Sequence, residues 1–101
     1  MGSRTNLQSL LESILDSQNV YFQPPESLKL SYPCIIYGRS DVNINYADDG
    51  AYSHKIRYTV TLIDKNPDST ILEKLINLPL CSYDRHYKAE NLNHDTFDLY
   101  Y

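Results

Sequence analysis

The stretch that decides the fold runs from residue 34 to residue 64 and reads CIIYGRSDVNINYADDGAYSHKIRYTVTLID. In its second half, apolar and polar side chains alternate with a period of two, the pattern of a strand that buries one face. The apolar face carries His54, Ile56, Tyr58, Val60 and Leu62, and the polar face carries Lys55, Arg57, Thr59 and Thr61. The stretch therefore predicts one long antiparallel β-hairpin.

The turn of this hairpin falls at residues 48–50, Asp-Asp-Gly, and the length of the loop decides which residues pair. A two-residue loop at its last two positions would place Val42 opposite a charged residue. A three-residue loop instead pairs Val42 with Ile56 and Ile36 with Leu62. We expect the three-residue loop, because it aligns the hydrophobic faces of the two strands.

The outer half of the hairpin, residues 40–54, is polar and rich in tyrosine. A hairpin of this length extends beyond what the core of a small domain can cover. We expect the outer half either to project as an arm or to stay partly disordered. Gly38, inside the first strand, predicts a bulge or a bend.

Two helices are expected beside these strands. Residues 5–18 place Leu7, Leu10, Leu11, Ile14 and Leu15 on one stripe at helical spacing. Residues 67–78 predict a second helix, with Asn66 as its N-cap and Pro67 in its first position. The buried stripe expected for this helix is Ile71, Leu72, Leu75 and Ile76.

The residues before the second helix also have the spacing with which a calcium-binding loop begins. Asp64, Asn66 and Asp68 alternate as the first ligands of an EF-hand loop do. Such a loop needs glycine at its sixth position and glutamate at its twelfth, where this chain has Ser69 and Leu75. We therefore expect a turn and a helix cap here instead of a metal site.

The remaining segments complete an α+β fold of one domain, residues 1–101, with a mostly antiparallel sheet flanked by the N-terminal helix and the second helix. Residues 81–101 predict two strands with a bend at AENLN, residues 89–93. Phe97, Leu99 and Tyr101 share one face of the last strand. Residues 19–33 predict an extended connector, because consecutive prolines at positions 24 and 25 exclude a helix.

Composition argues against several classes of function. The chain has 101 residues and a net charge of −4, so no basic surface favours nucleic acid as its main partner. It contains no apolar run of about twenty residues, so we expect no membrane partner. Cys34 and Cys81 lie in apolar surroundings, which predicts two buried, reduced thiols.

The sequence gives no sign of catalysis. Its three histidines have no metal-ligand spacing, and it lacks a nucleophile elbow, a phosphate-binding glycine loop and a dinucleotide fingerprint. We therefore expect no enzyme, no catalytic residue, no metal and no cofactor; a small enzyme or metal protein is the alternative. On a regular strand, Asp84 and His86 would share the face opposite Arg85, which predicts a charged surface or interface cluster.

Three segments carry a family resemblance: YPCIIYGRSD at residues 32–41, RYTVTLIDKNPDS at 57–69, and LPLCSYDRHYKAENLNHDTFDLYY at 78–101. Over about residues 20–101 the chain resembles small tail-terminator (tail-completion) proteins, which are head–tail joining proteins of long-tailed bacteriophages and prophages. The resemblance implies a compact α+β subunit that assembles as a hexameric ring on the last ring of the tail tube. Such a ring stops tube polymerisation and offers a surface to the head.

The same resemblance implies the partners: further copies of the chain, the tail tube protein and the head connector or stopper protein, with DNA only passing through the lumen. It implies a virion location at the head–tail junction, and the host cytoplasm during assembly. A head-completion or connector protein of the same virion is the first alternative, and a small non-enzymatic adaptor is another.

Ten residues are the candidates for subunit and tail-tube contacts. They form a hairpin set and a second patch: Arg39, Asp41, Tyr46, Asp48, Asp49, Lys55 and Arg57, and then Asp84, Arg85 and His86. Ten tyrosines, against two phenylalanines and no tryptophan, suit half-buried sheet faces and subunit interfaces. Charged pairs at the rim of such an interface set partner choice more than affinity.

Overall fold

The computed structural model describes residues 4–25, 27–47, 50–66 and 68–101, with side chains described outside residues 41–55. Its elements are α1 (Arg4–Leu15), β1 (Val20–Phe22), β2 (Cys34–Ala47), β3 (Gly50–Asp64), α2 (Thr70–Ile76), β4 (Cys81–Ala89) and β5 (Leu92–Tyr100). The predicted α+β class with a mostly antiparallel sheet is confirmed.

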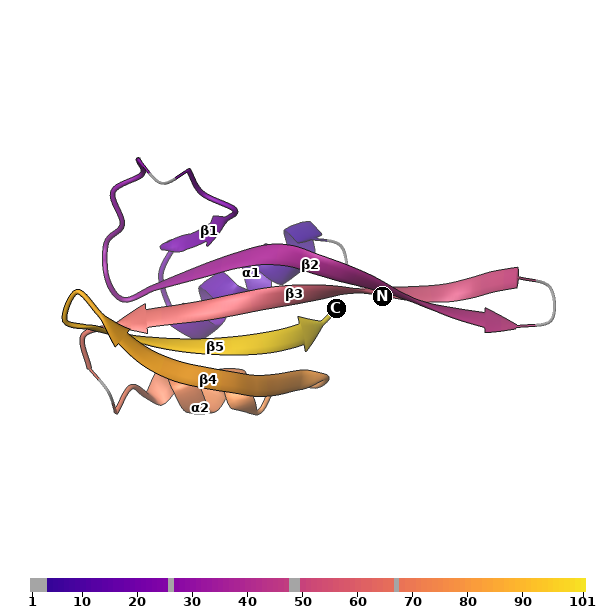
Figure 1. Cartoon of the computed structure of the whole chain (residues 1–101). Coiled ribbons are helices and arrows are strands. Elements are labelled where there is room, and N and C mark those ends of the chain that lie inside the picture. Colours follow the sequence, from indigo (N-terminus) through magenta and orange to yellow (C-terminus); the bar gives the residue numbers. More distant parts are fainter. Residues whose placement is uncertain (1–3, 26, 48–49, 67) are drawn as a thin grey trace.

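The five strands form one sheet in the order β1-β2-β3-β5-β4 (Figure 1). β1 pairs in parallel with residues Ile35–Tyr37 of β2, and every other pair is antiparallel. The sequence predicted an extended connector where β1 lies and did not predict this strand. Three residues are too few to show a period of two, so only the pairing with β2 identifies β1 as a strand.

The pairing of β2 with β3 departs from the prediction in the inner part of the sheet. Val42 lies opposite Ile56, as the three-residue loop predicted. Ile36, however, lies opposite Thr61 and not opposite Leu62, because the register shifts by one residue at Ser40. This β-bulge follows Gly38 by two residues, and it adds one residue to β2 that has no partner on β3.

A second register shift lies near the end of the two strands. Ala47 pairs with Gly50, so Gly50 belongs to β3, and its predicted place in the loop is wrong. Asp48 and Asp49 lie outside the described residues. The shift falls between Asn45 and Tyr46. If the register of Ala47 and Gly50 continued inward without a shift, Val42 would lie opposite Lys55; because of the shift, it lies opposite Ile56.

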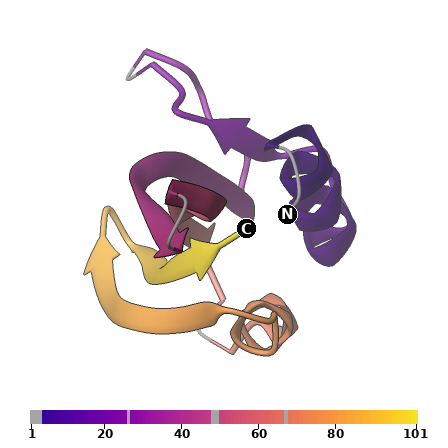
Figure 2. The same cartoon turned by 90° about the vertical axis from the view of Figure 1, so that its right-hand side faces the viewer.

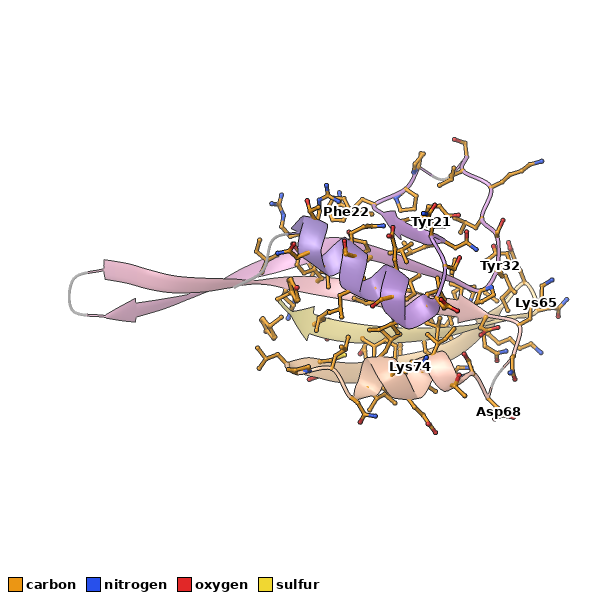
Figure 3. The ribbon with its side chains drawn as sticks, turned by 180° about the vertical axis from the view of Figure 1, so that it is seen from behind. Tyr21, Phe22, Tyr32, Lys65, Asp68 and Lys74 are labelled. Carbon is orange, nitrogen blue, oxygen red and sulfur yellow. The ribbon has the colours of Figure 1, made fainter. Side chains whose placement is uncertain are left out.

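Both helices cover the same face of the sheet (Figures 2 and 3). The main core lies between them and the strands, and its members are Leu7, Leu11, Ile14, Leu15, Val20, Ile35, Tyr37, Tyr58, Val60, Leu62, Leu75, Phe97 and Leu99. α1 contributes four of these residues, all from the stripe that the sequence predicted. Asp16 follows α1 with a φ of 56°, a left-handed conformation that ends the helix three residues before the predicted boundary.

α2 begins later than predicted, and it buries less. Ser69 is its N-cap, with its Oγ accepting a hydrogen bond from the Ile71 N–H at 3.2 Å. Asn66 is not the cap: its Oδ1 accepts from the Asp68 N–H at 3.0 Å and so forms a turn before the helix. Of the predicted buried stripe only Leu75 is buried, and Ile76 is 46% exposed. Pro67 lies outside the described residues.

β4 and β5 form the two predicted C-terminal strands. Ala89 pairs with Leu92, and the two residues between them, Glu90 and Asn91, have φ values of 53° and 64°. Two successive positive φ values are typical of the type I′ turn, whose twist suits a two-residue hairpin connection. The bend therefore lies within the segment AENLN, as predicted.

Candidate assembly surface

One face of the sheet is covered by neither α1 nor α2, and we call it the open face (Figure 2). Its central residues come from β3 and β5, and they are Thr59, Thr61, His94, Thr96 and Asp98. Their chain neighbours Val60, Phe97 and Leu99 face the helices and are buried. At these positions the alternation of β3 and β5 therefore gives the sheet an apolar face under the helices and a polar open face.

A β-bulge on β4 changes which of the predicted residues share a face. The register shifts between Tyr83 and Arg85, so that Arg85 pairs with Thr96 and Asp84 is the extra residue. Thr96 Oγ1 donates to Asp84 Oδ2 at 3.0 Å, which holds the carboxylate on the open face. Asp84 and Arg85 thus lie on the same face.

His86 lies on the other face, where its Nε2 is 3.2 Å from Asn93 Oδ1. The prediction that Asp84 and His86 share a face opposite Arg85 is therefore wrong. The prediction fails because the bulge interrupts the period of two within the segment SYDRHY.

β4 is an edge strand, and it is exposed along its length apart from its first residue, which is half-buried. Tyr87 stacks on His94, with ring centroids 4.7 Å apart and an angle of 16° between the planes. The Arg85 guanidinium lies 5.9 Å from the Tyr87 ring. Tyr87 is held on the open face by these contacts and is still 42% exposed.

Tyr83 is the second exposed tyrosine of β4, and it lies on the helix-covered side. Its ring packs edge-on against Phe97 at 5.3 Å, and its hydroxyl donates to Asp95 Oδ1 at 2.9 Å. Partial burial, the hydrogen bond to Asp95 and the negative charges of Asp95 and Asp84 raise the pKa of Tyr83 to about 12. The phenol is therefore a neutral donor at physiological pH.

A cavity of about 430 Å³ opens at the other edge of the open face. Its floor is formed by β2 and β3, and its wall by the segment that follows β1. The residues around it are Gln23, Pro24, Pro25, Leu28, Leu30, Ile36, Tyr37, Gly38, Thr59 and Thr61.

Gln23 anchors the wall of this cavity to β2. Its backbone N–H donates to the Tyr37 carbonyl at 2.9 Å, and its Oε1 accepts from the Arg39 N–H at 3.2 Å. The Gln23 side chain crosses Gly38, where an added Cβ would lie 3.1 Å from Gln23 Cγ. The lack of a side chain at Gly38 therefore allows this close approach.

At the start of β2 and the end of β3, a buried hydrophobic cluster excludes water from the open face. Cys34, Ile63 and Leu92 form a second buried cluster beneath Leu30. Burial, and secondarily the charge of Asp64, raises the pKa of the Cys34 thiol to about 11. Both cysteines are free thiols, and Cys34 is fully buried. Cys81 is half-buried at the start of the edge strand, so its predicted burial is wrong.

The hairpin candidates are only partly described. Arg39 is exposed, and Arg57 donates from Nε to Ser40 Oγ at 3.2 Å beside the first bulge. Asp41, Tyr46 and Lys55 lie on the paired backbone of β2 and β3, but their side chains are outside the described part, as are the whole residues Asp48 and Asp49. In the sheet order, two strands separate the candidates on β2 from Asp84 and Arg85, and one strand separates those on β3.

Sequence reasoning did not single out Tyr83, Tyr87 or the cavity. The surplus of tyrosine was the signal for the first two, but it did not say which tyrosines would be exposed. The cavity combines Gln23, Pro24, Pro25, Leu28 and Leu30 with Thr59 and Thr61, and only folding brings these segments together. No pattern of neighbouring letters could have predicted it.

The described residues contain no group of three or more histidine, cysteine or acidic side chains placed to hold a metal ion. No helix within the described ranges is long and apolar enough to cross a membrane. No protein-family model matches the chain, and no curated protein sequence matches it either. What the arrangement offers is a surface for contact, with an exposed edge strand and two exposed tyrosines at one side and a cavity at the other.

Proposed function

We propose that this chain is a non-enzymatic structural subunit of a long-tailed phage, which assembles into a ring on the end of the tail tube as a tail terminator. The ring would stop polymerisation of the tube and offer the surface to which the head attaches. Its partners would be further copies of the chain, the tail tube protein and the head connector or stopper protein, at the head–tail junction of the virion.

The observation that carries this proposal is the exposed edge strand β4. An edge strand exposes a row of backbone groups, and soluble monomers commonly shorten or cover such edges. Here the edge strand has nine residues and carries Tyr83 and Tyr87, which are 46% and 42% exposed. Tyrosine is enriched in protein interfaces, because it combines apolar area with a polar tip.

A second feature supports a subunit with more than one contact surface. The distal parts of β2 and β3 extend past the ends of β4 and β5 (Figure 1), and the longest dimension of the chain is 51 Å against 26 and 23 Å. In the proposal, this pair of strands is one long hairpin that acts as an arm towards the tail tube or the adjoining ring. The core of a small domain is too small to pack against such an extension, so in the proposal a partner covers it.

The charge of the chain fits a ring through which DNA passes. With a net charge of −4, the subunit has no general attraction for the phosphate backbone. Acidic side chains along the lumen would keep DNA from binding to the wall. If neutralising such acids leaves DNA ejection unchanged, that part of the proposal is wrong.

The test is electron microscopy of lysates from the phage or prophage that encodes the chain, with a stop codon placed early in its gene. The tail-terminator role predicts overlong or unjoined tails beside DNA-filled heads. Supplying the intact gene on a plasmid should restore tails of normal length, and this controls for effects on neighbouring genes.

Two other results would contradict the role. Tails of normal length beside leaking heads would assign the chain to head completion instead. Normal infectious virions would remove the structural role altogether, and an adaptor or an enzyme would then have to be considered.

A further inference from the structure

We infer that the cavity lined by Gln23, Pro24, Pro25, Leu28 and Leu30 receives the Tyr87 side chain of a neighbouring copy of this chain, in a head-to-tail contact. The inference rests on the proposed ring and names the contact that would close it.

The chemistry of the cavity favours an uncharged aromatic group. None of the described residues that line it carries a charge, so among them a buried ionic group would lose its hydration without gaining a partner. Its apolar wall includes Pro24, Pro25 and Leu28, while its floor carries Thr59 and Thr61, whose hydroxyls bond to no other described residue. A volume of about 430 Å³ lies within the range of sites that hold small ligands, about 300–1,000 Å³.

Tyr87 has the matching chemistry. Its ring is apolar and 42% exposed, and its hydroxyl bonds to no other described residue. The stack on His94 and the neighbouring Arg85 guanidinium fix its orientation before any partner arrives. A fixed aromatic side chain loses little conformational entropy on binding, which is typical of residues that dominate interface energetics.

The positions of the two features suit a ring. Sheet order places the cavity on β2 and β3 and Tyr87 on β4, so they lie towards opposite edges of the same face. A ring needs a heterologous contact, in which one patch meets a different patch on the next subunit. A pocket at one edge and a projecting side chain at the other supply the two unlike patches.

The exposed apolar side chains follow the same division. Leu28 and Tyr32 lie on the segment that borders the cavity, and Leu80, Tyr83 and Tyr87 lie on β4 or directly before it. Ile76, at the end of α2, is the remaining large apolar side chain that stands exposed in the described part of the chain. A head-to-tail contact on the open face would cover Leu28 at one edge and Tyr87 at the other at once.

Photo-cross-linking tests this contact directly. Tyr87 is replaced by the photo-reactive residue p-benzoylphenylalanine, which preserves an aromatic ring at that position. The protein is irradiated at high concentration and also in cells that make the phage, where tail tubes are present to nucleate rings. Linked peptides are then identified by mass spectrometry.

The expected result is an intermolecular link from position 87 to residues 23–30 or 59–61. Thr61→Leu, which fills the floor of the cavity, should abolish this link while the protein keeps its circular dichroism spectrum and melting temperature. The photo-reactive residue at position 83, on the other side of the sheet, is the matched control and should not link to the cavity.

The inference is overturned if position 87 forms no intermolecular link under either condition. Links from position 87 to β4 of the second copy would also overturn it, because they indicate a two-fold contact. These outcomes leave the stop-codon experiment unaffected. A phage that needs the gene for normal tails but shows no link to the cavity would retain the terminator role and lose only this contact.

Discussion

The two faces of this sheet are built from the same strands, yet they differ in almost every property. On β5, Phe97 and Leu99 are 0% and 2% exposed beneath the helices, while their neighbour Asp98 faces the side without helices. The covered face excludes water and holds the fold together. The open face has a polar floor, a cavity and an exposed tyrosine, and these features are available to a partner.

The largest effect that would test this comparison is the loss of a core side chain. Phe97→Ala should lower the free energy of unfolding by about 3–5 kcal/mol, because it removes a fully buried ring and leaves a cavity. Tyr87→Ala on the open face should cost much less, about 1 kcal/mol or below. Urea unfolding of both variants measures the difference, and equal losses would contradict the division into a stabilising face and a contact face.

A pH titration tests the buried cluster that contains Cys34. Burial raises the pKa of Cys34 to about 11, so the folded state keeps a proton that the unfolded chain releases near pH 9. The contribution of the buried thiol to the free energy of unfolding is therefore fully present below that pH, and it is lost as the pH rises towards 11, by on the order of 2 kcal/mol. Cys34→Ala should lack this part of the decline, and parallel pH profiles for the two proteins would contradict the burial of the thiol.

The hydroxyl of Tyr37 offers a smaller test within the covered face. Tyr37 is 1% exposed, and its hydroxyl donates to Gln8 Oε1 on α1. Tyr37→Phe should cost about 1–1.5 kcal/mol, because the buried Tyr37 side chain loses its hydrogen bond to the half-buried Gln8 amide. Tyr87→Phe is the matched control on the open face and should change stability by less than about 0.5 kcal/mol. Thermal unfolding that ranks the two variants in the opposite order would refute the assignment.

The smallest expected effect concerns the start of α2. Ser69→Ala removes the side chain that caps the Ile71 N–H, and it should cost about 1 kcal/mol. Asn66→Ala should cost less, because Asn66 stabilises only the turn before the helix. If chemical denaturation shows the larger loss for Asn66→Ala, the helix starts where the sequence predicted and not at Ser69.

Alternation and helical spacing were enough to predict much of the fold. The buried residues of α1, the faces of β3 and the two C-terminal strands follow from the spacing of apolar letters. Gly38 predicted a bulge or a bend in β2, but the position of that bulge at Ser40 and the bulge at Asp84 do not follow from the letters, because which residue lacks a partner is a property of two strands together. The start of α2 was missed because Asn66 and Ser69 are both good caps, and only the turn after Asp64 decides between them.

The candidate site was less predictable than the fold. The sequence predicted mostly charged residues on the hairpin and on β4 as the site, whereas the structure shows an exposed Tyr87 and a cavity whose described lining carries no charge. Charged letters are conspicuous in a sequence, but exposure of an aromatic ring depends on which strand lies at the edge of the sheet. That order, with β5 between β3 and β4, follows from long-range pairing that local patterns do not encode.

The bulge at Asp84 also bears on how this surface can change during evolution. Deleting one residue there would restore uniform alternation, and the side chains on one side of the deletion would exchange faces relative to those on the other. Because β4 is an edge strand with little buried area, such a deletion would spare most of the core. A single codon could therefore give related chains a new contact surface on an unchanged scaffold, which is one route by which assemblies of different specificity diverge.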